Sequence, residues 1–130
     1  MIVLDASAAV EAVLDLPLGL AVIERLSSAP TTHAPAHLDM EVLSALRRLS
    51  LRGLLSDRDA DIAFTDYEQL PIRRWPSTQQ LMRAFALRHS VGAGDALYVA
   101  LSEVLEAPLI TTDKRLARSH GHRAQIELIE

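Results

Sequence analysis

Four acidic residues stand at positions where an α/β protein could bring them together. Asp5 follows a short apolar run at the start of the chain, and Asp113 follows a second apolar run near its end. Asp95 opens a predicted helix, and Glu41 lies within another. Ligands of open parallel α/β sheets bind beyond the carboxyl ends of the strands. The two aspartates that follow strands are therefore the first candidates for a site, and Asp95, at a helix start, is expected to face the same end.

Several carboxylates that meet at one point repel one another unless cations are bound. Magnesium and manganese are hard cations that prefer oxygen ligands, and magnesium keeps several of its waters when it binds protein. Such a centre suits phosphodiester hydrolysis, because the cation lowers the pKa of a water and stabilises charge on the leaving oxygen. The four acids thus predict a metal-dependent phosphodiester hydrolase.

Two other functions are compatible with strand-end aspartates. An aspartate between a strand and a helix often caps the helix, and a chain whose acids only cap would be a non-catalytic α/β binding module. A magnesium-dependent phosphate-monoester hydrolase of the haloacid-dehalogenase kind also uses a strand-end aspartate, but it needs a second aspartate two residues later, where this chain has Ser7. The residues three and four positions after Glu41, which would contact it on a helix, are Ser44 and Ala45. Neither is charged, so no local ion pair is expected for Glu41.

The elements that position these acids are predicted from apolar periodicity and from glycine and proline. Pro35 is expected in the first turn of a helix, and Gly92-Ala93-Gly94 is expected to form a flexible break before Asp95. Strands are expected at 2–4, 31–34, 71–75, 108–111 and 126–129, and helices at about 5–14, 20–26, 36–52, 57–70, 77–89, 95–105 and 114–119. Alternating strands and helices favour a mostly parallel sheet covered on both faces.

Composition limits the remaining classes. A chain of 130 residues with 49% hydrophobic and 23% charged residues fits a single globular domain spanning 1–130. It has no cysteine and no apolar run long enough to span a bilayer, so we expect a cytoplasmic protein without membrane association. The net charge is −4, from 17 acidic and 13 basic residues. Four site acids account for that excess, which bound cations would neutralise.

The order and surroundings of the four acids resemble the PIN-domain family, specifically the VapC-type toxins of bacterial toxin–antitoxin pairs. The resemblance covers essentially the whole chain and rests on four segments. These are IVLDASA at 2–8, APAHLDMEV at 34–42 followed by ALRR at 45–48, DALYVAL at 95–101 and LITTDKRL at 109–116. Four segments that agree in order and spacing are far more specific than one short motif.

The resemblance implies a three-layer α/β/α nuclease fold that cleaves single-stranded regions of RNA with Mg²⁺ or Mn²⁺. It further implies a homodimer that a cognate antitoxin holds inactive. Asp5, Glu41, Asp95 and Asp113 match the catalytic and metal-binding acids of the family. Ser7 and Thr111 match hydroxyl positions that support the site, with Thr112 beside them, and Lys114, Arg115 and Arg118 are candidate contacts for RNA phosphates.

Overall fold

A five-stranded sheet lies at the centre of the molecule, and every pair of neighbouring strands is parallel. The computed structural model describes all residues from 1 to 130. The strand order is β3-β2-β1-β4-β5. The strands are β1 (Ile2–Leu4), β2 (Thr32–Pro35), β3 (Ile72–Trp75), β4 (Leu109–Thr111) and β5 (Ile126–Leu128). The expected parallel sheet is confirmed, and it is parallel throughout.

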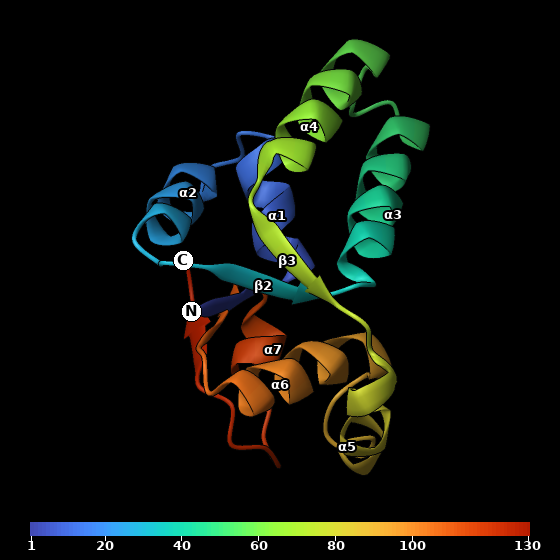
Figure 1. Cartoon of the computed structure of the whole chain (residues 1–130). Helices are drawn as coiled ribbons and strands as arrows, with labels where there is room; N and C mark the ends of the chain where they lie inside the picture. The colour runs from blue at the N-terminus through green and yellow to red at the C-terminus, as the bar shows by residue number, and fades with distance from the viewer.

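Helices cover both faces of this sheet (Figure 1). The helices are α1 (Ala6–Val13), α2 (Gly19–Ser27), α3 (Leu38–Leu51), α4 (Asp57–Gln69), α5 (Leu81–Ala86), α6 (Ala93–Leu105) and α7 (Lys114–Ala117), with a short 3₁₀ helix at Thr78–Gln80. In Figure 1, α1 to α4 lie above the sheet, and α5 and α6 lie below it. The predicted three-layer α/β/α fold is therefore confirmed. None of these helices combines the length and apolar composition needed to cross a membrane.

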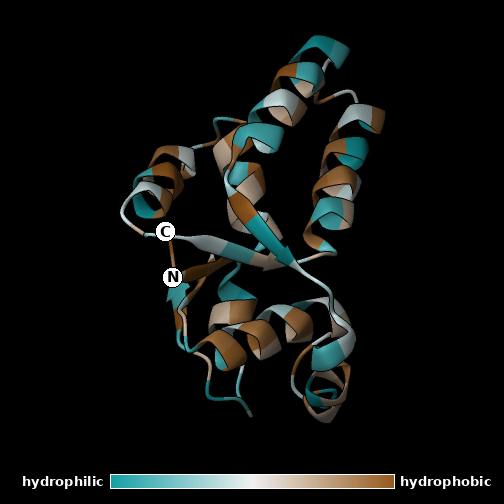
Figure 2. Ribbon diagram, viewed as in Figure 1, coloured by the Kyte–Doolittle hydropathy of each residue, from teal (hydrophilic) through white to brown (hydrophobic).

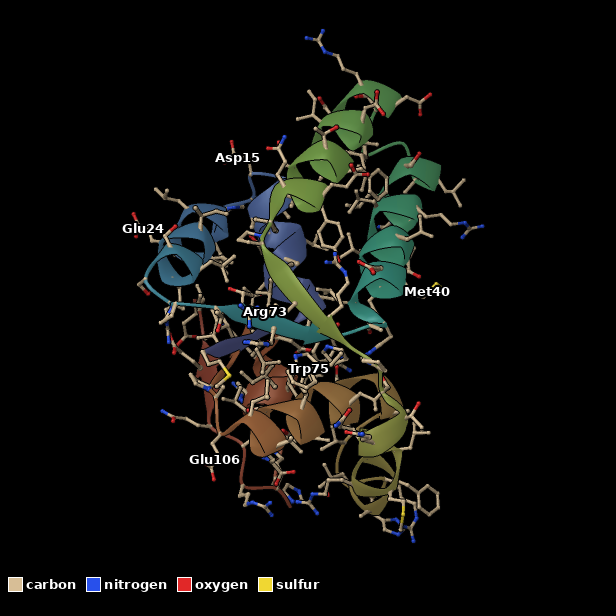
Figure 3. The ribbon with its side chains drawn as sticks, viewed as in Figure 1. Asp15, Glu24, Met40, Arg73, Trp75 and Glu106 are labelled. Carbon is tan, nitrogen blue, oxygen red and sulfur yellow. The ribbon has the colours of Figure 1, made fainter.

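Burial separates the three interior strands of the sheet from its two edges. All residues of β2, β1 and β4 are buried, as expected for strands covered on two faces. In Figure 2, α6 carries broad apolar stretches where it packs beneath the sheet, whereas polar and apolar residues alternate along α4. At the edge, β3 is mostly exposed, and Figure 3 shows Arg73 and Trp75 along it. The Trp75 indole N–H donates to Nδ1 of the buried His33 at 2.9 Å.

The start of α3 differs from its prediction. Pro35 is the last residue of β2, not part of a helix, and α3 begins at Leu38. Proline is tolerated because β1 pairs with β2 only at Thr32 and His33, so Pro35 lies past the end of β1 and no sheet bond is lost there. Gly53 follows Arg52, the C-cap residue of α3, and its φ of 72° is one that glycine adopts without strain.

Two further helix predictions were wrong in detail. Gly92-Ala93-Gly94 is not a flexible break, because Gly92 is the extended N-cap residue and α6 already begins at Ala93. Asp95 therefore lies in the first turn of α6 and does not open the helix. The helix expected at 77–89 is divided into the 3₁₀ turn and α5, which ends at Ala86.

Candidate active site

An open cleft of about 630 Å³ lies beyond the carboxyl ends of β1 and β4, between α1, α3 and the first turn of α6. Its lining includes all four predicted acids, Asp5, Glu41, Asp95 and Asp113. The other lining residues are Ala6, Ser7, Val10, Glu11, Ser44, Ala45, Arg48, Thr112 and Arg115. Four acids from four separate segments thus share one cavity, at the end of the sheet where the sequence placed them.

Asp5 is the most buried of the four, with 5% of its surface exposed. It occupies the N-cap position of α1, but its side chain caps no backbone N–H. Instead its Oδ2 accepts hydrogen bonds from the Ser7 hydroxyl at 2.6 Å and the Thr111 hydroxyl at 2.7 Å. Burial raises the pKa of Asp5, the two hydroxyl bonds oppose that rise, and the charge of Glu41 adds to it.

The two hydroxyls also fix the loop after β4. Ser7 accepts the backbone N–H of Thr112 at 3.1 Å, and Thr111 accepts that of Asp113 at 3.0 Å. Each hydroxyl has one hydrogen, which it gives to Asp5, and it uses a lone pair for the loop. The strand-end aspartate and the loop that carries Asp113 are therefore held by the same pair of side chains.

Asp95 is the acid whose ionisation is most affected by the others. Its pKa is raised from 3.8 to about 6, first by burial and then by the charges of Asp5, Asp113 and Glu41, while Arg115 lowers it. All three other acids act on Asp95 at a range where carboxylates disfavour one another's charge. The metal-free cleft is thus electrostatically crowded around this residue.

Glu41 projects from the first turn of α3, whereas the adjacent Met40 points outward into solvent (Figure 3). Its Oε1 accepts a hydrogen bond from the Tyr98 hydroxyl at 2.6 Å and lies 3.3 Å from Nε2 of His37. The His37 contact lowers the pKa of Glu41 most, burial raises it, and the Tyr98 bond lowers it. The expectation that Glu41 has no local partner was wrong, because His37 lies four residues before it on the same helix face.

Asp113 is the only one of the four acids that caps a helix. Its Oδ1 accepts the backbone N–H of Arg115 at 2.8 Å at the start of α7. The capping alternative therefore describes Asp113 but neither Asp5 nor Asp95, whose side chains make no such bond. Asp113 also lines the cleft, so the same residue both caps α7 and belongs to the candidate site.

The donor set of the cleft fits a hard divalent cation. Its ligand candidates are carboxylate oxygens, which magnesium and manganese prefer over nitrogen and sulfur. No three of the chain's acidic or histidine side chains, as placed, lie close enough together to enclose one ion. Magnesium commonly binds through one or two carboxylates plus waters, so it does not require three protein ligands.

The basic residues near the cleft divide into two groups. Arg115, one of the three predicted phosphate contacts, lines the cleft, whereas Lys114 and Arg118 are exposed and do not. Arg48 of α3 also lines the cleft and forms no ion pair with any acid of the chain. Positive charge therefore reaches the cleft from two different helices.

Known proteins resemble this chain in sequence along nearly all of its length. The model of the PIN-domain family matches residues 2–120. The chain belongs to the PIN-domain family. Ribonuclease VapC12 of Mycobacterium tuberculosis is 51% identical to this PIN domain over 129 residues, which cover 99% of each chain. Ribonuclease VapC3 of the same organism is 37% identical over 118 residues, or 91% of this chain and 86% of its own.

Solved structures share the fold of this PIN domain at low sequence identity. A toxin–antitoxin complex from Klebsiella pneumoniae contains a chain with a TM-score of 0.72 and 14% identity, covering 100% of this chain and 98% of its own. VapC20 of Mycobacterium tuberculosis, a toxin that cleaves the sarcin–ricin loop, has a TM-score of 0.67 and 17% identity, covering 90% and 93%. These likenesses establish the α/β/α architecture.

Sequence reasoning missed several residues that shape the site of this PIN domain. Arg48 was not distinguished from Arg47 and Arg52 of the same helix, because periodicity does not tell which polar residue of α3 faces the cleft. His37 and Tyr98 were not considered as partners of Glu41. The spacing of His37 and Glu41, four residues apart, was the available signal.

Proposed function

We propose that this PIN domain is a magnesium- or manganese-dependent endoribonuclease that cleaves single-stranded regions of RNA. The observation that carries the proposal is the environment of Asp95, whose charge is disfavoured by burial and by three other carboxylates of one cleft. Crowded carboxylates of this kind are stabilised by a divalent cation. The VapC ribonucleases among the relatives supply the class of substrate.

Asp5, Glu41, Asp95 and Asp113 would hold the metal. When bound, the cation supplies Lewis acidity, which lowers the pKa of a water and stabilises negative charge on the phosphate. Ser7 and Thr111 keep the Asp5 carboxylate oriented and partly offset the effect of burial on its pKa. Thr112 contributes its backbone N–H to the same hydrogen-bond network and is among the residues that line the cleft.

The arginines position the substrate in this proposal. Arg48 and Arg115 lie on the lining of the cleft, where guanidinium groups bind the phosphates that flank the bond to be cleaved. Lys114 and Arg118 are placed for weaker contacts with the RNA strand outside the cleft. A cleft that carries both acids and arginines also accounts for RNA binding by a chain whose net charge is −4.

We further propose that the protein is the toxin of a toxin–antitoxin pair, acts in the cytoplasm as a homodimer and is inhibited by a cognate antitoxin. The support is the relationship to VapC ribonucleases and the structural likeness to chains from toxin–antitoxin complexes. Exposed apolar side chains on α5, namely Leu81, Met82 and Phe85, offer contact area for a protein partner. Co-purification with the product of the neighbouring small gene, followed by light scattering, tests both associations.

The deciding experiment compares cleavage of a single-stranded RNA in Mg²⁺, in Mn²⁺ and in EDTA. Wild-type protein should cleave only with metal, and Asp5→Asn should be inactive under every condition. Glu11→Gln is the matched control, because Glu11 lines the cleft but its Oε2 is engaged by the backbone N–H of Leu18 at 3.1 Å. A phosphate monoester, assayed beside the RNA, should not be hydrolysed. Equal cleavage in EDTA would overturn the proposal.

A further inference from the structure

The two oxygens of the Glu41 carboxylate have different surroundings. Oε1 receives the Tyr98 hydroxyl at 2.6 Å and lies 3.3 Å from Nε2 of His37, whereas Oε2 has no hydrogen bond within the protein. Tyr98 is fully buried, so its hydroxyl is fixed by packing. The carboxylate is consequently held by one oxygen, and the other oxygen is free to bind a ligand.

Gly94 supports the free oxygen from the side. A Cβ atom at position 94 would lie 3.3 Å from Glu41 Oε2 and 3.7 Å from His37 Nε2, so these two side chains pack against the bare glycine. The Gly94 carbonyl also accepts a hydrogen bond from His37 Nε2 at 3.1 Å. The backbone φ angle of Gly94 is not positive, so the backbone conformation does not require glycine at this position.

This glycine is unfavourable for the helix that contains it. Gly94 lies inside α6, where alanine stabilises a helix better than glycine does. Helix stability therefore gives no reason for glycine here, but the space needed by Glu41 does. Gly94 and Tyr98 are four residues apart, so both present themselves to Glu41 from one face of α6, directly beside Asp95.

We propose that Gly94, Tyr98 and His37 are positioning residues that orient Glu41 as a metal ligand through its Oε2. This inference rests on the proposed function and adds to it the residues that fix the only glutamate among the four acids. A glutamate on a helix has three side-chain torsions to restrict, and groups that restrain a metal ligand typically contribute a factor of about 10 to 100 in metal affinity.

The test measures Mn²⁺ affinity by electron paramagnetic resonance and, separately, the melting temperature of metal-free protein. Gly94→Ala should weaken Mn²⁺ binding about 10-fold or more while the metal-free melting temperature holds or rises, because alanine favours the helix. Gly92→Ala is the matched control, since a Cβ at Gly92 meets nothing within 4 Å, and it should keep wild-type affinity. Tyr98→Phe should also weaken binding, because Oε1 loses its shortest hydrogen bond.

A double substitution separates positioning from a general effect on the fold. In a Glu41→Gln background, Gly94→Ala and Tyr98→Phe should cause no further loss of Mn²⁺ affinity, because both act through Glu41. Wild-type affinity in Gly94→Ala, or an equal loss with and without Glu41, would overturn the inference. Absence of Mn²⁺ binding to the wild type would instead contradict the proposed function, so the two failures are distinguishable.

Discussion

Ser7 and Thr111, which are separated by 104 positions in the sequence, place their hydroxyl oxygens 3.1 Å apart and both donate to the same oxygen of Asp5. Ser7 comes from the first turn of α1, and Thr111 is the last residue of β4. This pair therefore joins the two ends of the chain at the most buried acid of the cleft. It also makes the charge on Asp5 tolerable, since the hydroxyl bonds lower a pKa that burial raises.

Removing either hydroxyl should weaken the site without unfolding it. Ser7→Ala and Thr111→Val keep small side chains but each removes one bond to Asp5, so the pKa of Asp5 should rise further and the acidic limb of the pH–activity curve should move to higher pH. Metal affinity should fall about 10- to 100-fold. Ser44→Ala is the control, because Ser44 lines the cleft without contacting Asp5. An unmoved pH profile in both variants would contradict this role.

The cleft arginines should control how RNA binding depends on salt. Arg48→Ala and Arg115→Ala should each weaken binding and reduce the slope of log affinity against log salt by about 0.7, the value for one phosphate contact to a single strand. Turnover should persist. Arg52→Ala, one helical turn beyond Arg48, should leave the slope unchanged, and Lys114→Ala should have a smaller effect. Titrations of a metal-inactive Asp5→Asn background at several salt concentrations provide the measurement.

The products of cleavage should carry a 5′-phosphate and a 3′-hydroxyl. This follows if a metal-activated water attacks the phosphorus in line and expels the 3′ oxygen. Treating the products with a 5′-phosphate-dependent exonuclease, and analysing their ends by mass spectrometry, provides the measurement. A 2′,3′-cyclic phosphate would mean that the 2′-hydroxyl of the RNA attacked instead, and the proposed chemistry would then be wrong.

Much of the fold follows from local signals. Buried apolar runs identified β1 and β4, and the sequence at 36–52 identified α3 to within a few residues. The errors at Pro35 and Gly94 have a tertiary origin. Pro35 can extend β2 because β1 ends before reaching it, and Gly94 lies within α6, where its missing side chain leaves room for Glu41. Neither neighbour is visible from the local sequence.

The candidate site, like the fold, could be predicted only in part from the sequence. The strand-end position of Asp5 and Asp113 indicated a common location, since parallel strands end at one edge of the sheet. Which basic residues would face the cleft could not be predicted in this way. Arg48 and Arg52 both lie on the polar side of α3, and only the packing of that helix in the folded protein shows that Arg48 lines the cavity and Arg52 does not.

Asp95→Asn should stabilise the metal-free protein at neutral pH. The pKa of Asp95 is raised from 3.8 to about 6, so the folded state favours its neutral form. For a raised pKa, the stabilising contribution is complete below about pH 4 and is lost as pH rises through about 6. Asparagine stays neutral throughout. The variant should therefore match the wild type near pH 4 and exceed it near pH 7.5, by about 1 to 3 kcal/mol in the free energy of unfolding.

The comparison of wild type and variant isolates Asp95 from other groups that titrate in this range. Raised pKa values at Asp5 and His37 also make wild-type stability depend on pH, but both groups are present in the two proteins. Denaturant unfolding in EDTA at several pH values gives the difference curve. Adding Mg²⁺ should then make the wild type more stable than Asp95→Asn at pH 7.5. A cation that binds only the folded state gives more stability to the protein that binds it more tightly. An Asp95→Asn protein that gains as much from Mg²⁺ as the wild type, or cleaves RNA at the wild-type rate, would remove Asp95 from the metal site.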